Sequence, residues 1–163
     1  MKDELKEYIK NNFVKSKKLH SLFRNAFFST MDDYKCEEKA TNLSEYVKEK
    51  DNYSNFQNLL FKMIDDRDLK DSDVYNKVHI DRRLFSKLRS NNYHPSKDTV
   101  ILLGLSLELS EDEIVDLLDS ASYSLPKNNY YDLIIRFCFI NKIYDISKVN
   151  ELLDEYNCKL FNY

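Results

Sequence analysis

Basic side chains collect in one short stretch of this otherwise acidic chain. Residues 82–97 contain five Lys or Arg and no Asp or Glu, whereas the whole sequence carries a formal net charge of -3. Such a local concentration of guanidinium and ammonium groups is what contact with nucleic-acid phosphates requires. A solvated basic face, or a surface that contacts another protein, would show the same pattern, and these alternatives stay open.

Other reactive side chains are too scattered to predict a catalytic or metal centre. A metal site needs clustered ligands, and the three histidines neighbour no cysteine. Acid pairs such as Asp65-Asp66 are expected on solvated helix faces rather than in a cleft. We therefore predict a non-enzymatic protein with no catalytic residues, no metal and no cofactor. An odd cysteine count and no export signal predict unpaired thiols: Cys36, Cys138 and Cys158.

The composition favours an all-α fold. One Gly and two Pro among 163 residues disfavour β-sandwiches and barrels, which use both residue types at many turns. Because Gly104 stands alone, no Gly-rich phosphate loop can form. No apolar run reaches the length of about 18 residues that a membrane span needs, and the N-terminal sequence MKDELKEYIK lacks a signal-peptide core. We expect a cytoplasmic protein that does not contact membranes.

Helical spacing of apolar residues runs through 53–163, which we predict to be one domain. Asp81 and Ser96 are placed to cap the third and fourth helices, and Ser110 with Glu113 forms a capping-box pattern. The expected helices cover about 56–64, 71–78, 82–90, 97–107, 111–121, 127–141 and 147–157.

Residues 1–52 predict a helical N-terminal arm that is partly flexible, with a loose connection near 29–52. Two sets of apolar residues fall at helical spacing in it. The arm is expected to pack on the main domain or to bind a protein partner. The two sets are Leu5, Tyr8, Ile9 and Phe13, and Leu19, Leu22, Phe23, Ala26 and Phe27.

Three consecutive segments carry a family resemblance. They are VYNKVHID at 74–81, RRLFSKLRSN at 82–91, and Pro95-Ser96 at the start of the next helix. Over residues 56–121 the chain resembles the Xre/Cro/phage-repressor family of helix-turn-helix domains. The resemblance implies a five-helix core, extended here by two C-terminal helices. It also implies sequence-specific binding of double-stranded DNA by a bacterial or phage transcriptional regulator.

The same resemblance implies which side chains meet DNA. The major groove admits one α-helix, so the helix at 82–90 must protrude while Phe85 and Leu88 anchor it. In the family pattern Arg82, Arg83 and Lys87 reach base edges. The candidate DNA contacts are Arg82, Arg83, Ser86, Lys87, Arg89, Asn92 and Lys97.

Three positions depart from the family pattern. Tyr75 stands where the second helix usually has a small residue, so it must separate the two helices or turn outward. His79 stands at the turn position usually held by Gly, where φ is positive. Asp71 stands where a Gln often meets a phosphate, and its carboxylate would repel that group. The alternative function is therefore a protein-interaction module or inhibitor that reuses the fold without binding DNA.

A second resemblance covers residues 6–14, 80–97 and 130–153. These segments are similar to a helical region of bacterial proteins that occurs alone or fused behind a macrodomain. This likeness implies that the last two helices belong to the same domain, and it favours recognition of proteins.

Two further surfaces suggest partners. The run 108–119 holds six acids and no base, which fits a solvated face, a surface that repels DNA, or a site for a basic partner. The helix at 127–141 is apolar around more of its circumference than one core-facing stripe requires, so it needs a second burial partner. That partner is either the arm of the same chain or the same helix of another chain. We predict a homodimer through the C-terminal helices, with the arm at its rim.

Overall fold

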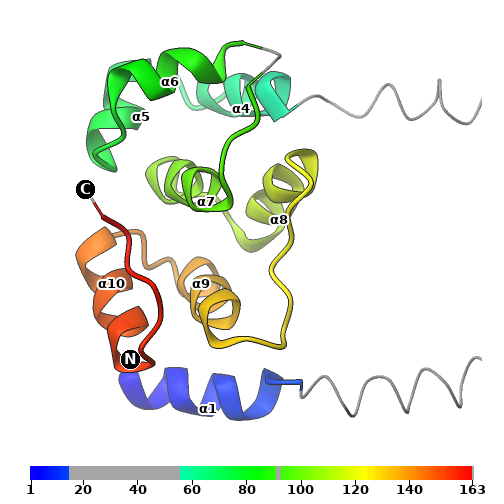
Figure 1. The fold of residues 1–163 in the computed structure, drawn as a ribbon, viewed down its shortest axis with the longest axis vertical. Coiled ribbons are helices and arrows are strands. Elements are labelled where there is room, and N and C mark those ends of the chain that lie inside the picture. The colour runs from blue at the N-terminus through cyan, green and yellow to red at the C-terminus, as the bar shows by residue number, and fades with distance from the viewer. Residues whose placement is uncertain (15–55, 91–92, 163) are drawn as a thin grey trace, which may run out of the picture.

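Eight helices and no strand make up the computed structural model over the residues that it describes, 1–14, 56–90 and 93–162 (Figure 1). The all-α prediction is thus confirmed for this part of the chain. The helices are α1 (Lys2–Asn12), α4 (Phe56–Asp65), α5 (Asp71–Lys77), α6 (Arg82–Leu88), α7 (Lys97–Ser106), α8 (Glu111–Ser120), α9 (Tyr130–Ile140) and α10 (Ile146–Glu155).

The helices lie in three tiers. In Figure 1 α4, α5 and α6 form one end of the molecule, α7 and α8 lie in the middle, and α9, α10 and α1 form the other end. Helix α7 has buried residues on every side, which explains its almost unbroken apolar sequence VILLGLS. It packs against α5 and α8, and α8 also contacts α4 and α9. The middle tier therefore joins the two ends.

The helix starts follow the predicted caps. The Asp81 carboxylate accepts hydrogen bonds from the backbone N–H groups of Arg83 and Leu84 at 2.7 and 3.3 Å. Ser96 caps α7, and the capping box of Ser110 is present in full. Helix α9 starts at Tyr130 rather than near 127, because the Asn129 side chain accepts a hydrogen bond from a backbone N–H of its first turn.

Left-handed residues end six of the helices. In each case the left-handed residue is not Gly, and its φ lies between 50° and 60°. The next amide then donates back to the last turn, as in Tyr123 N–H to Leu118 O at 2.8 Å. This geometry lets a chain with one Gly end its helices sharply, and the positive φ expected at the turn before α6 is confirmed. The six residues are Asp68, His79, Glu108, Ser122, Lys142 and Asn157.

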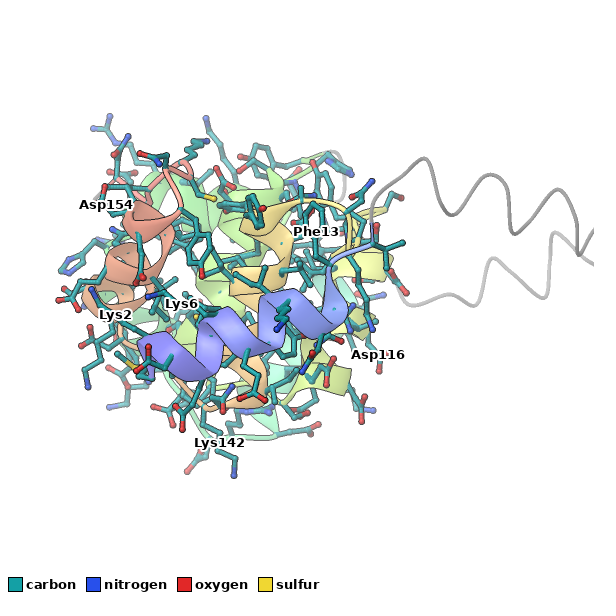
Figure 2. All side chains as sticks on the ribbon, turned by 90° about the horizontal axis from the view of Figure 1, so that it is seen from below. Lys2, Lys6, Phe13, Asp116, Lys142 and Asp154 are labelled. Carbon is teal, nitrogen blue, oxygen red and sulfur yellow. The ribbon has the colours of Figure 1, made fainter. Side chains whose placement is uncertain are left out.

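Helix α1 packs against the far end of the sequence. Leu5 and Ile9 are buried, and the Tyr8 ring lies 5.4 Å from that of Phe137 on α9. Figure 2 shows α1 lying across this end of the molecule, with Lys2 and Lys6 beside α10. The first predicted helix of the arm thus completes the C-terminal tier. The second apolar set and the loose connection near 29–52 lie outside the described residues.

The carboxylate of Glu113 makes the start of α8 sensitive to acid. The backbone N–H of Ser110 lowers the pKa of Glu113, burial opposes this, and the Arg67 guanidinium lowers it further. The pKa of Glu113 is therefore lower in the folded chain than its value near 4.5 in the unfolded chain. The charged Glu113 carboxylate stabilises the fold fully above pH 4.5. This stabilisation is lost as the pH falls through the lower pKa of the folded chain.

We therefore expect Glu113→Gln to lower the urea midpoint of unfolding near neutral pH and to have little effect at about pH 3. Asp112→Asn removes an exposed carboxylate from the same turn and is the matched control. Equal differences between Glu113→Gln and the parent chain at both pH values would contradict the assignment.

Candidate nucleic-acid interface

Helix α6 carries its basic residues on the side away from the core. Phe85 and Leu88 are buried against the rest of the molecule, three residues apart on one face of the helix. The opposite face is exposed. It holds Arg82, Arg83, Ser86 and Lys87.

The three basic side chains on this face are not paired with carboxylates of the described residues. No ion pair between residues of the described ranges involves Arg82, Arg83 or Lys87. Helix α6 lies at the end of the molecule opposite α1, so α1 does not cover it (Figure 1). The exposed side of α6, with Arg82, Arg83, Ser86 and Lys87, is called the α6 face below.

Arg89 is held inside the same tier. Its guanidinium pairs with the Asp71 carboxylate at 2.5 Å and lies 4.2 Å above the ring of Phe61. These contacts tie the end of α6 to the start of α5 and to α4. The charge of Asp71, which the sequence indicated would repel a phosphate, is offset by Arg89. Arg89 in turn stabilises the helix arrangement and is less free to contact a ligand.

Lys97 does not lie on the α6 face. It stands in the first turn of α7, and its ammonium group pairs with the Asp132 carboxylate of α9 at 2.5 Å. Asp132 is only 4% exposed and also accepts a hydrogen bond from the Asn129 side-chain amide at 2.6 Å. Lys97 therefore holds the middle tier to the C-terminal tier, and no residue near Lys97 in the sequence indicates this partner. Asn92 lies outside the described residues.

Tyr75 occupies the space between α5 and α6. Its ring is half-buried and lies 5.5 Å from the ring of Phe85. Both rings line a shallow hollow between the two helices, together with Lys70, Ser72 and Arg82. Sequence reasoning did not select Lys70 or Ser72. The signal that could have found them is their place beside Asp71, at the helix start that often contacts phosphate in the family that this segment resembles.

The apolar residues of α9 are covered within the chain. The helix packs against α1, α8 and α10, so the surface on which the dimer prediction was based is filled by this molecule itself. Only its two ends leave large apolar side chains exposed, Tyr130 and Ile140. The homodimer through the C-terminal helices stays a prediction. The buried residues are Leu133, Ile134, Ile135, Phe137, Cys138 and Phe139.

The described cysteines are free thiols. Burial raises the pKa of Cys138 to about 12, and it also raises that of the half-buried Cys158. Both are therefore poor nucleophiles near neutral pH. Cys36 lies outside the described residues. Within the ranges given above, no three His, Cys, Asp or Glu side chains gather as a metal ion would require.

None of the eight helices is both long and apolar enough to cross a bilayer, over the part of the chain that the structure describes. Comparison with protein-family models, with curated proteins and with solved structures found no match.

Proposed function

We propose that α5, the turn after it and α6 form a helix-turn-helix that binds double-stranded DNA, in a transcriptional regulator of the Xre-like class. The observation that carries this proposal is the α6 face. Its bases are exposed and form no ion pair with any other described residue, while Phe85 and Leu88 fix the helix to the core. A single helix anchored along one side and basic on the other has the dimensions of a major-groove reader.

The contacts divide into two kinds. Arg82, Arg83 and Lys87 reach base edges and the adjoining phosphates from the α6 face, because Arg and Lys donate to guanine as well as to phosphate. Lys70 and Ser72 lie beside the hollow at the start of α5, where they meet the DNA backbone. Arg89 and Lys97 keep their internal carboxylate partners.

This division predicts the salt dependence of binding. Three free bases on α6 together with Lys70 give a slope of about -3.6 for log K against log salt per chain, at about -0.9 for each phosphate neutralised. The affinity should therefore fall roughly 150-fold between about 50 and 200 mM salt. If Arg89 and Lys97 were engaged as well, six bases would give a steeper slope, of about -5.4.

The test is fluorescence anisotropy with a labelled duplex at low salt. Arg83→Ala with Lys87→Ala should weaken binding by about tenfold or more, since each lost contact costs about 1 kcal/mol or more. Lys142→Ala with Lys148→Ala removes the same charge from exposed positions elsewhere and is the control. No binding at about 50 mM salt, or an equal loss in the control, would reject the DNA proposal.

The second candidate is a protein-interaction module that reuses the same helices. The observation that favours it is the Asp71–Arg89 ion pair, which places a neutralised pair where the family contacts phosphate. A chain that binds no duplex but still presents exposed apolar surface would fit this alternative.

A further inference from the structure

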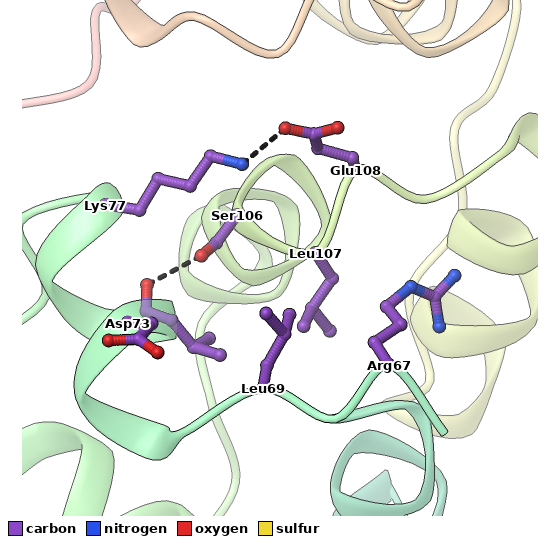
Figure 3. Close-up of a pocket in the computed structure, with 8 residues that line it drawn as sticks. Arg67, Leu69, Asp73, Lys77, Ser106, Leu107 and Glu108 are labelled. Carbon is purple, nitrogen blue, oxygen red and sulfur yellow. Dashed lines mark hydrogen bonds and ion pairs between the residues drawn. The ribbon is translucent and has the colours of Figure 1, made fainter. Parts of the chain in front are cut away.

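Two hollows with apolar floors lie beside the end of α7, apart from the hollow between α5 and α6. The first hollow measures 440 Å³ and lies between the α4–α5 connection and the end of α7, with Leu69 and Leu107 at its base (Figure 3). The second hollow measures 460 Å³ and is floored by Phe139, Ile140 and Tyr144 at the end of α9.

The hollows adjoin each other. Glu108, which ends α7, lines both of them. Arg67 lines the first and Glu113 the second, and these two side chains form an ion pair at 2.6 Å between the hollows. The two hollows therefore form one surface, called the paired hollow, with the Arg67–Glu113 ion pair between its halves.

Each half of the paired hollow exposes a large aliphatic side chain. Leu69 is 36% exposed in the first hollow and Ile140 is 42% exposed in the second. They are among the few large apolar side chains that the described residues leave this open to water. Apolar side chains of a partner could be buried against each of them, which would remove apolar surface from water and favour binding.

The charges around the paired hollow indicate which charge its partner carries. Lys77 is paired with Glu108 at 2.6 Å, and Arg67 and Arg136 are paired with Glu113 and Glu111. Among the residues that line the hollows and their immediate neighbours in sequence, the charges that form no ion pair with a described residue are those of five carboxylates and two ammonium groups. They are Asp66, Asp68, Asp73, Asp112 and Asp145, and Lys70 and Lys142.

We propose that the paired hollow binds a basic segment of another protein, which places one aliphatic side chain in each half. The apolar floors supply the affinity, and the excess of carboxylates excludes acidic partners and selects Lys and Arg beside the anchors. No residue of the α6 face lines either hollow, so the paired hollow is a site additional to the one proposed for DNA.

The probe is a short labelled peptide of leucine and lysine at helical spacing, titrated by anisotropy against the full chain. We expect saturable binding that weakens with salt. Leu69→Ser with Ile140→Ser should weaken it by about tenfold or more, because both anchors lose apolar contact. Leu160→Ser is the matched control, since Leu160 is also 36% exposed but belongs to the C-terminal tail. Both altered residues are already exposed, so circular dichroism should show an unchanged fold.

Three results would overturn the proposal. The first is no saturable binding, which includes the case in which the chain covers the hollows with its own residues. The second is that a serine–lysine peptide binds as tightly as the leucine–lysine peptide, which would show that charge alone accounts for the affinity. The third is an equal loss of affinity in Leu160→Ser.

Discussion

Replacing Lys97 with alanine is expected to lower the free energy of unfolding by about 3 kcal/mol. The variant leaves the Asp132 carboxylate in a site where it is only 4% exposed, with the Asn129 amide as its remaining side-chain partner. Loss of one member of a buried ion pair is costly because the other charge stays desolvated. Asp132→Asn should cost less, since the Lys97 side chain is a quarter exposed and its ammonium can reach water.

Urea unfolding of the two variants and the parent chain measures this asymmetry. Lys148→Ala removes an exposed lysine and should change stability by no more than about 0.5 kcal/mol. A loss in Lys97→Ala as small as that of the control would show that the ion pair contributes little.

Replacing Gly104 with valine is expected to cost about 3 kcal/mol through overpacking. A Cβ atom at this position in α7 would lie 2.5 Å from Cδ1 of Ile114 and 3.1 Å from Cζ of Phe139. Both neighbours are fully buried core residues of α8 and α9. The single Gly of the chain thus allows the middle tier to approach α9 closely, and the larger side chain would push the helices apart.

A compensating change makes this prediction specific. Ile114→Ala alone should cost about 3 kcal/mol by leaving a cavity. Combined with Gly104→Val it keeps the core volume, so the double variant should lose less than about 3 kcal/mol rather than the sum of about 6. Thermal and urea unfolding of all four chains give the coupling. Additive losses would mean that the valine is accommodated away from Ile114.

Local signals predicted the helices well. The side chains of Asp81, Ser96 and Ser110 each accept a hydrogen bond from a backbone N–H no more than three residues away. Their capping roles can therefore be predicted from neighbouring residues in the sequence. The spacing of Phe85 and Leu88 likewise predicted which side of α6 is exposed. In both cases the determining contacts are short-range.

Long-range partners could not be predicted in the same way. Nothing near Lys97 indicates Asp132, which lies 35 residues away, and nothing near Arg89 indicates Asp71. Two of the predicted DNA contacts consequently prove to be engaged inside the molecule. The surplus apolar surface of α9 was recognised correctly, but the sequence alone left open whether the same chain or another would cover it.

The packing of α1 on α9 also sets an order of events during synthesis. Asn12 ends α1 and Ile140 ends α9, so 128 residues separate their completion on the ribosome. At about 5–20 residues per second, this corresponds to a delay of roughly 6–25 s. A helix of α1's length is marginal in water without a packing surface. Leu5 and Ile9 therefore stay unburied in the nascent chain until α9 emerges, and this interval is when chaperones would have access to them.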